Sequence, residues 1–317
     1  MALKFRLFPS LRTRLSGLLV LTLLFSMTST SVQAGTIVRV STSVGDYSIE
    51  LLDEEAPITV QNFLGYVNSD VYNGTYLHRV VTDFVVQGGG YRFQPFVGPI
   101  DVVAGPSIVN EFGAPNFRGT VAMAKLEGLP DSATHEWFVN LSDNISLDTN
   151  SGGFTVFGKV LGNGMAVLDA IDDLPKINLG VKASDAPFLA ATYNDPRDFV
   201  YINVEVVERF SESAHVYETN SGLLITSVSV NADEEILSLN FNTITATPTL
   251  QVQANLNSVL RRRDSFVGIA NYSTTDNRLR IPALEVTQGD AVLLFTNVVF
   301  LLTDAESSIF TLESYDQ

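Results

Sequence analysis

The residues best suited to chemistry lie in one short stretch that runs from Tyr76 to Gly90. Apolar residues dominate both halves of this stretch around a polar turn, which predicts two neighbouring strands. Arg79 falls on the first strand, Gln87 on the second, and the aromatic Phe84 between them. A guanidinium offers only donors and a fixed charge, whereas a glutamine amide both donates and accepts hydrogen bonds. The pattern alone also fits an ordinary strand pair that carries a surface arginine.

Composition argues against several other chemistries. The chain has no cysteine, which excludes disulfides, thiol catalysis and a lipid-anchored lipoprotein. Its three histidines, His78, His135 and His215, stand at no metal-ligand spacing, so a zinc centre is not expected. The three glycines after Gln87 are not a nucleotide motif, because no helix pattern follows them. A formal net charge of -16 argues against binding to nucleic acid or to anionic lipid.

The stretch resembles the central signature of the cyclophilin family. That signature runs Phe-His-Arg, a hydrophobic pair, a short turn, Phe, a hydrophobic pair and Gln-Gly-Gly; here Tyr76 or Leu77 replaces the first Phe. Other segments look like family landmarks in the right order: Ala56–Phe63, Asn110–Glu111, Gly119–Ala124, Trp137–Val139 and Val156–Val160. The resemblance covers roughly residues 36 to 208 and is greatest to the bacterial exported subtype. It implies a peptidyl-prolyl cis-trans isomerase.

The resemblance also implies a site of nine residues. Arg79 matches the catalytic arginine, Gln87 the glutamine that holds it, and Phe84 the aromatic of a proline pocket. The residues expected to bind substrate are Val85, Ala124, Glu136, Phe138, Leu147 and Phe154. A site of this kind needs no metal and no cofactor.

The chemistry of such a site is the rotation of an X-Pro peptide bond. Rotation crosses a barrier of about 18–20 kcal/mol, and the uncatalysed exchange takes roughly tens to hundreds of seconds. A guanidinium aimed at the proline amide stabilises the twisted state and not the planar one, which is differential binding. Apolar side chains would grip the proline ring while the preceding carbonyl rotates.

Several positions depart from the family pattern. Glu136 stands where Gln is usual, and Phe154 stands where many members have His, although exported bacterial members often have an aromatic there. Relative to the family pattern, two residues are inserted between Ala124 and Glu136, and Lys125 replaces the usual Asn. If Glu136 lies in the groove, its charge would pair with Arg79 and favour basic peptides. If the insertion shifts it into solvent, it would do little.

Two functional hypotheses follow. The first is an active isomerase that acts on proline-containing polypeptides among exported proteins and assists their folding. The second is a binding module, a chaperone or adhesion protein, that captures proline-containing segments with little turnover. Arg79, Phe84, Gln87 and Phe138 together favour the enzyme, whereas Glu136 favours its rival. Partners of nucleic-acid or membrane type are not expected once a leader segment is removed.

The elements that would position these residues are mainly strands. Runs of strand type number eight: Ile37–Val40, Tyr47–Leu51, Tyr76–Val80, Phe84–Gln87, Gly119–Ala124, Glu136–Leu141, Phe154–Val160 and Phe199–Val207. Pro57 opens a helix with an apolar stripe at i, i+3, i+4 and i+7, and a second short helix is predicted around Leu168. Eight strands and two helices predict a mainly β fold, a closed eight-stranded cyclophilin-like barrel with capped ends.

The composition changes after about residue 208, where Ser, Thr and Asn become frequent. Short alternating runs, such as Leu223–Val230 and Ala291–Leu302, predict a separate small β-rich domain over residues 218–317. Residues 209–217 would be a linker after an isomerase domain at 35–208. The second domain carries no catalytic grouping, and binding, dimerisation and spacing all remain possible roles for it.

The first 34 residues differ from the rest. Four basic residues precede an apolar run at Leu18–Phe25, and the small-residue pattern Val32-Gln33-Ala34 follows. This layout is typical of a secretory signal peptide, and the apolar run is short for a membrane span of about 20 residues. Its removal leaves 15 basic residues against 35 acidic ones, a net charge of -20. A periplasmic or secreted location is therefore expected.

Some conspicuous residues are given no functional role. His78 is structural in the family, and His135 and His215 are expected to be solvated. The run Arg261–Arg263 is expected to form a wet charged face. Asn140 and Asn144 begin glycosylation triplets, which would be silent in a bacterial source.

Overall fold

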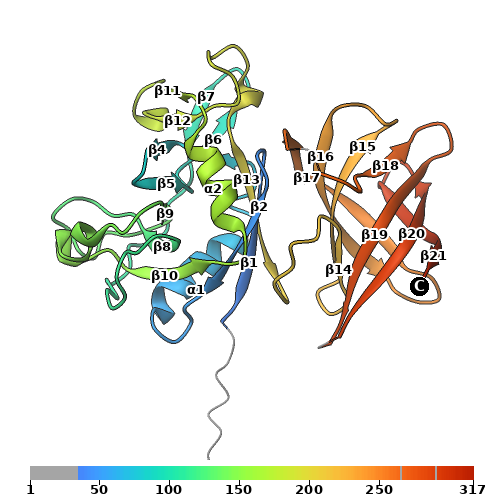
Figure 1. The fold of residues 1–317 in the computed structure, drawn as a ribbon, viewed down its shortest axis with the longest axis horizontal. Coiled ribbons are helices and arrows are strands. Elements are labelled where there is room, and N and C mark those ends of the chain that lie inside the picture. Colours follow the sequence, from blue (N-terminus) through green and yellow to red (C-terminus); the bar gives the residue numbers. More distant parts are fainter. Residues whose placement is uncertain (1–34, 265, 290) are drawn as a thin grey trace, which may run out of the picture. The chain divides into compact units, whose positions relative to one another are not determined.

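The computed structural model describes residues 35–264, 266–289 and 291–317. Residues 35–317 form one compact unit, in which the chain builds two large β-sheets in succession (Figure 1). The mainly β fold with two α-helices and an additional β-rich C-terminal part is confirmed. The expected signal segment at residues 1–34 lies outside the described residues. Within the described ranges, no helix is both long and apolar enough to cross a membrane.

The first sheet has eleven strands in the order β4-β5-β9-β8-β10-β2-β1-β13-β3-β6-β7. Their bounds are β1 Ile37–Thr42, β2 Asp46–Leu51, β3 Thr75–Tyr76, β4 Arg79–Val81, β5 Val85–Gly88, β6 Tyr91–Gln94, β7 Gly98–Asp101, β8 Thr120–Met123, β9 Trp137–Asn140, β10 Val156–Val160 and β13 Tyr201–Val207. The sequence predicts eight strands, and the structure has more for two reasons. One predicted strand is interrupted and becomes β3 and β4, and the hairpin of β6 and β7 adds two.

The interruption makes the sheet curl. β3 and β4 lie far apart in the strand order, yet only Leu77 and His78 separate them along the chain. Both linking residues keep their backbone bonds to the sheet: Leu77 N–H donates to Val200 O at 3.0 Å, and His78 N–H donates to Gln87 O at 3.2 Å. The sheet therefore turns back on itself at this bend, and Arg79 follows directly after it.

Two helices cover the first sheet, as predicted. α1 spans Pro57–Val67, and its proline occupies the first turn, where a fixed φ and a missing N–H cost nothing. Its buried residues recur at a spacing of three to four, so one face packs against the sheet. α2 spans Gly164–Asp172 and buries Leu168 and Ile171. The short elements between are η1 Ile145–Asp148, η2 Asn150–Gly152, β11 Lys176–Ile177, η3 Val181–Ala183, β12 Ala186–Pro187 and η4 Pro196–Asp198.

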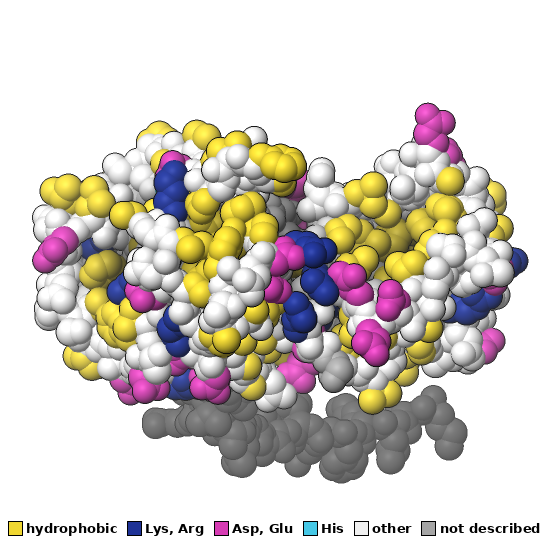
Figure 2. Space-filling view, turned by 90° about the horizontal axis from the view of Figure 1, so that it is seen from above, with side chains coloured by type: hydrophobic (Ala, Val, Ile, Leu, Met, Phe, Trp, Pro, Cys, Tyr) yellow, Lys and Arg dark blue, Asp and Glu magenta, His cyan; other side chains and the backbone are white. Residues whose placement is uncertain are grey.

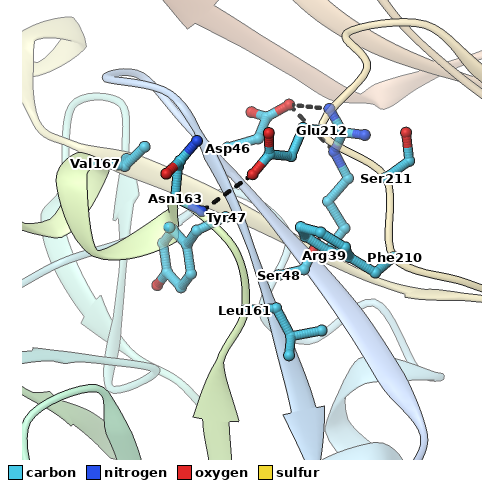
Figure 3. A pocket seen from close by; sticks show the side chains of 11 residues that line it. Arg39, Asp46, Tyr47, Ser48, Leu161, Asn163, Val167, Phe210, Ser211 and Glu212 are labelled. Carbon is cyan, nitrogen blue, oxygen red and sulfur yellow. Dashed lines mark hydrogen bonds and ion pairs between the residues drawn. The ribbon is translucent and has the colours of Figure 1, made fainter.

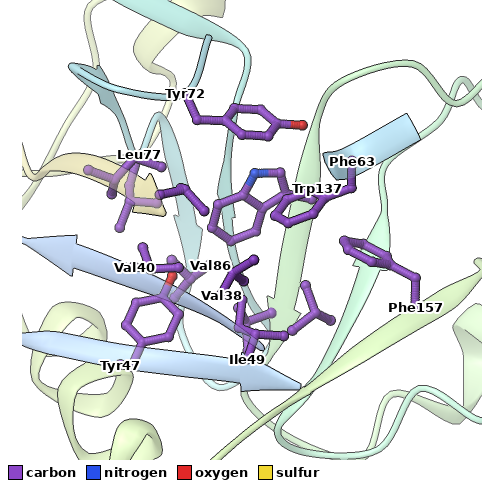
Figure 4. Close-up of a cluster of buried hydrophobic side chains, with 14 of the residues drawn as sticks. Val38, Val40, Tyr47, Ile49, Phe63, Tyr72, Leu77, Val86, Trp137 and Phe157 are labelled. Carbon is purple, nitrogen blue, oxygen red and sulfur yellow. The ribbon is translucent and has the colours of Figure 1, made fainter. Parts of the chain in front are cut away.

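The core of this sheet is built around aromatic side chains (Figure 4). Trp137 is fully buried, and its ring meets Phe63 and Tyr72 edge-on at centroid distances of 6.2 and 6.4 Å. Val86 lies in the same core. Because side chains alternate along a strand, anchoring Trp137 and Val86 inside sends their neighbours Phe138 and Gln87 to the opposite face. The core thus determines which residues reach the outer face of the curled sheet.

The second sheet has eight strands in the order β14-β15-β16-β17-β21-β20-β19-β18, with further pairings β14–β19 and β15–β18. Their bounds are β14 Val216–Glu218, β15 Leu223–Val230, β16 Ile236–Thr245, β17 Gln251–Arg262, β18 Ala270–Ser273, β19 Arg278–Gln288, β20 Ala291–Asp304 and β21 Ile309–Asp316. It encloses its own hydrophobic core, which includes Phe241, Phe300 and Phe310. The domain boundary near residue 208 stays a prediction.

Two residues expected at the wet surface are buried. His215 is 4% exposed, and its two ring nitrogens lie 2.6 Å from Thr226 Oγ1 and 2.8 Å from Gly268 O. The Arg262 side chain is 5% exposed and forms ion pairs with Asp264 and Asp46. The expectation was wrong for both because paired carboxylates and hydrogen-bond acceptors offset the desolvation of these side chains.

Candidate functional site

Arg79 and Gln87 face each other across the ladder between β4 and β5. Arg79 Nη1 donates a hydrogen bond to Gln87 Oε1 at 3.1 Å. Both side chains are half-buried. They lie on the same face of the β4–β5 pair, opposite to the face that carries the core residue Val86. The guanidinium is therefore held at the surface with donors left over for a bound molecule.

The polar chain continues from Gln87 to Glu136. Gln87 Nε2 donates to Glu136 Oε2 at 2.7 Å, and His78 Nε2 lies 3.4 Å from the same oxygen. Burial raises the pKa of Glu136, but His78, Gln87 and His135 together lower it by more, so that the pKa lies below its usual 4.5. Glu136 is thus an ionised acceptor at the far end of a chain that begins at Arg79.

This placement differs from both expectations for Glu136. The Glu136 side chain is only 26% exposed, so it does not stand free in solvent. Its hydrogen bond runs to Gln87 and not to Arg79, because Gln87 lies between them and bonds to both.

An apolar cluster adjoins this chain. β5 pairs with β9, and Gln87 lies directly opposite Phe138. The cluster contains six of the nine predicted site residues: Phe84, Val85, Ala124, Phe138, Leu147 and Phe154. Phe138 and Phe154 meet at nearly right angles, with ring centroids 5.8 Å apart. The structure therefore brings all nine residues into two adjoining groups, one polar and one apolar.

The loops bring two members of the cluster together. Phe154 N–H donates to Leu147 O at 3.0 Å, so η1 and the segment before β10 meet beside the cluster. Ala124 N–H donates to Glu136 O at 2.9 Å, which keeps the end of β8 next to β9 despite the longer connection between them. Leu147 is 8% exposed and Phe138 is 4% exposed, so both are buried in the cluster, whereas Phe84 and Phe154 are half-buried at the edge of the cluster.

A buried network of amides supports the apolar cluster and was missed from the sequence. Asn144 Nδ2 donates to Phe84 O and to Asn140 Oδ1, both at 2.8 Å. Asn116 Nδ2 donates to Asp148 Oδ1 at 2.9 Å and to Phe154 O at 3.1 Å. Asn140 and Asn144 drew notice only as glycosylation triplets, and their burial leaves no room for a sugar.

Lys125 is a second residue whose role the sequence did not show. Its Nζ lies 2.9 Å from Ser151 O, 2.5 Å from Gly153 O and 3.3 Å from Asn110 Oδ1. The same nitrogen lies 5.0 Å from the centre of the Phe154 ring. Burial lowers the pKa of Lys125, partly offset by Asp131. The lysine side chain thus binds the loop that carries Phe154.

Other places in the described residues offer less chemistry. No cluster of three or more His, Cys, Asp or Glu suited to a metal occurs in the ranges that the structure describes. A cavity of about 200 Å³ is lined by Arg39, Asp46 and Tyr47 among others (Figure 3). Arg39 and Asp46 are already paired there at 2.5 Å. None of the nine site residues lines this cavity.

Part of this chain is similar to known proteins. Residues 37–189 match the family model described as cyclophilin type peptidyl-prolyl cis-trans isomerase/CLD. A peptidyl-prolyl cis-trans isomerase of Acinetobacter baylyi is 40% identical over 152 residues, which are 47% of this chain and 78% of that protein. Peptidyl-prolyl cis-trans isomerase A of Dickeya dadantii is 42% identical over 149 residues, 46% of this chain and 75% of that protein. A crystal structure of a Cryptosporidium parvum cyclophilin type isomerase aligns with a TM-score of 0.43 at 22% identity, over 55% of this chain and 98% of that one.

Proposed function

We propose that this chain, which belongs to the cyclophilin-type peptidyl-prolyl cis-trans isomerase family and is a peptidyl-prolyl isomerase, acts on X-Pro bonds of exported proteins that are still folding. The observation that carries the proposal is the junction of Arg79 and Gln87 with the apolar cluster around Phe138. One group fits a twisting amide and the other fits a proline ring. We also propose that the polar residues act on the rotating amide and that the apolar residues hold the proline ring.

Arg79 stabilises the rotating amide. Gln87 holds the guanidinium by one nitrogen at 3.1 Å, so its other N–H groups can reach the substrate. A guanidinium bond to the twisted amide that is weaker in the planar states lowers the barrier. One charge-assisted hydrogen bond contributes about 1.5–3 kcal/mol, which is roughly 10- to 200-fold in rate at 1.36 kcal/mol per tenfold.

The apolar cluster grips the proline ring. Phe138 and Leu147 form a buried floor, and Phe84 and Phe154 stand at the edge. Val85 completes the wall, and Ala124 leaves room for the peptide backbone. The ring stays fixed while the preceding carbonyl turns, so rotation occurs about one bond only. No proton is transferred and no covalent bond is formed or broken.

The proposed clients are exported proteins in incompletely folded states. The basic and apolar leader at residues 1–34, the absence of cysteine and the acidic remainder support a periplasmic or secreted location. Apolar surface beside the pocket supports unfolded clients: Phe112 is 38% exposed and packs over Gly153, next to Phe154. Figure 2 shows hydrophobic side chains in several groups on one face, among neutral and charged ones.

Two measurements test the location and the client class. Fractionation of the producing cell, with N-terminal sequencing of the recovered protein, should find it outside the cytoplasm and starting near Gly35. The refolding of an exported protein whose slow phase is X-Pro isomerisation should be accelerated by the wild-type chain. A cytoplasmic protein that retains its first 34 residues would contradict the export part. No acceleration of that refolding phase, despite activity on short peptides, would contradict the client part.

A further inference from the structure

The Glu136 side chain belongs to the polar chain of the site. Its Oε2 accepts a hydrogen bond from Gln87 Nε2 at 2.7 Å. The other end of the same amide, Gln87 Oε1, accepts from Arg79 Nη1 at 3.1 Å. The two ends of one glutamine amide therefore have different partners. An amide that is turned over would offer its NH₂ group to the guanidinium, and donor would face donor.

We propose that Glu136 is a positioning residue that fixes the Gln87 amide in one orientation, so that its carbonyl oxygen is always presented to Arg79. This inference rests on the proposed role of Arg79 and extends it. A carboxylate can only accept hydrogen bonds, so it can bond only to the NH₂ end of Gln87. A glutamine at position 136 could bond to either end, and would leave the amide free to turn over.

The charge of Glu136 adds to its effect on orientation. A hydrogen bond to an ionised acceptor is about twice as strong as a neutral one. Hydrogen bonds in a chain also polarise one another, so the bond to Glu136 makes Gln87 Oε1 a better acceptor for Arg79. The arginine is thereby held at 3.1 Å from an oxygen while its remaining donors stay free.

Several titratable groups face Glu136. His78 lies 3.4 Å from its Oε2, and His135 precedes it in the chain. Tyr72 and Tyr91 lie close enough for the Glu136 charge to contribute to the raised pKa of each phenol, of which burial is the larger cause. An acceptor-only carboxylate favours the His78 tautomer with its proton on Nε2. These groups also titrate in a Glu136→Gln variant. The contribution of Glu136 to the pH dependence of activity is therefore the difference between the pH profiles of the wild type and of that variant.

The test compares Glu136→Gln with Glu127→Gln. Both substitutions remove one negative charge from the connection between β8 and β9. Glu136 lies at the end of that connection, next to β9, whereas Glu127 lies within it, is exposed and is outside the polar chain. We expect Glu136→Gln to lower kcat about 3- to 10-fold with little change in KM, because a charge-assisted bond becomes a neutral one. Glu127→Gln should match the wild type. Glu136→Asp keeps the charge but shortens the reach, and should also lower kcat.

A double-mutant cycle separates positioning from general damage. If Glu136 acts through Arg79, Glu136→Gln should have no further effect on kcat in a chain that already carries Arg79→Ala. The Gln87 side-chain NH₂ signal in ¹⁵N–¹H spectra should shift as pH falls below 4.5 in the wild type, and this shift should be absent in Glu136→Gln. The activity of the wild type should fall in the same pH range, relative to that of the variant.

Three results would overturn the inference. The first is an unchanged kcat in both Glu136→Gln and Glu136→Asp. The second is that the losses of kcat caused by Glu136→Gln and Arg79→Ala are additive in the double mutant. The third is a Gln87 NH₂ signal that is the same in wild type and Glu136→Gln. Each can occur while the wild-type chain remains an active, arginine-dependent isomerase. Loss of the Arg79 effect itself would instead contradict the proposed mechanism.

Discussion

Gln87 connects the charged groups of the site. Its amide accepts from Arg79 and donates to Glu136, and its backbone lies opposite Phe138 on the next strand. The polar and apolar halves of the site therefore share one strand pair. A substitution at Gln87 is expected to disturb the arginine more than the apolar cluster, since the cluster has its own support from Asn144.

A second carboxyl group gives the first prediction. Burial, together with Asp70, raises the pKa of Glu205 from 4.5 to about 7, and its Oε1 accepts from Asn73 at 3.2 Å and Asn240 at 3.0 Å. The folded chain then binds this proton more tightly than the unfolded chain does. Stability should therefore fall as pH rises from about 5 to about 8, by on the order of 2 kcal/mol.

Glu205→Gln tests this dependence directly. The amide keeps an oxygen for both donors and cannot ionise. Urea unfolding at pH 5 and pH 8 should show a smaller pH effect in Glu205→Gln than in the wild type, with the variant more stable at pH 8. The exposed carboxylate Glu54 provides the matched control, as Glu54→Gln. Equal pH effects in all three chains would refute the assignment.

The sequence predicted part of the site and missed part of it for physical reasons. Arg79 and Gln87 could be placed on facing strands because both lie in one contiguous motif with a turn between them. The partner of Glu136 could not be predicted, since it depends on the path of a lengthened connection. The role of Lys125 was hidden because two of its acceptors are backbone oxygens, at Ser151 and Gly153, which any residue type would supply.

The segment from η2 to β10 carries Phe154 and is attached to the rest of the chain by Lys125. Lys125 Nζ binds two backbone oxygens of this segment and one oxygen of Asn110. Lys125→Met removes all three bonds, and should lower stability by at least the contribution of one charge-assisted hydrogen bond, about 1.5–3 kcal/mol. A less constrained Phe154 should also raise KM for an X-Pro peptide more than it lowers kcat.

Lys159→Met is the control for this prediction. The Lys159 side chain is 55% exposed and forms an ion pair with Glu50, a surface pair of the kind that contributes little. Unfolding curves and Michaelis plots of both variants provide the comparison. A KM that is unchanged in Lys125→Met would show that Phe154 is positioned without the lysine.

The accuracy of the predicted elements follows from their burial. β15 spans Leu223–Val230 as predicted, and all but its last residue is buried. Helix α1 begins at the predicted Pro57, because a proline and an apolar stripe both signal it. The hairpin of β6 and β7 was missed because each strand has only four residues and neither strand buries one fully, so the alternation of Tyr91 and Phe93 with polar residues is too short to indicate a strand.

A small apolar cluster joins the C-terminal sheet to the first sheet. Ile37 and Val207, on β1 and β13, pack with Leu223 and Ile225 of β15. A chain that ends at Glu208 exposes this cluster and should have a lower Tm, since each buried aliphatic side chain contributes about 1.5–3 kcal/mol. The site itself lies on β4, β5, β8, β9 and nearby loops, so it should survive.

Activity separates the two effects of this truncation. We expect kcat/KM on a short X-Pro peptide to stay within about twofold of the full chain at a temperature where both are folded, because distant changes act independently. Circular dichroism melts of both chains establish that temperature. A truncated chain that is folded yet inactive would show that the C-terminal sheet takes part in the site.

The catalytic role of Arg79 is tested by the rate of cis-to-trans exchange of an X-Pro peptide, measured with the wild type and with Arg79→Ala. We predict that the wild type accelerates exchange and that Arg79→Ala, still folded by circular dichroism, is about 10- to 200-fold less efficient. Exchange that is not accelerated by the wild type, or that is accelerated equally by the folded variant, would contradict this prediction.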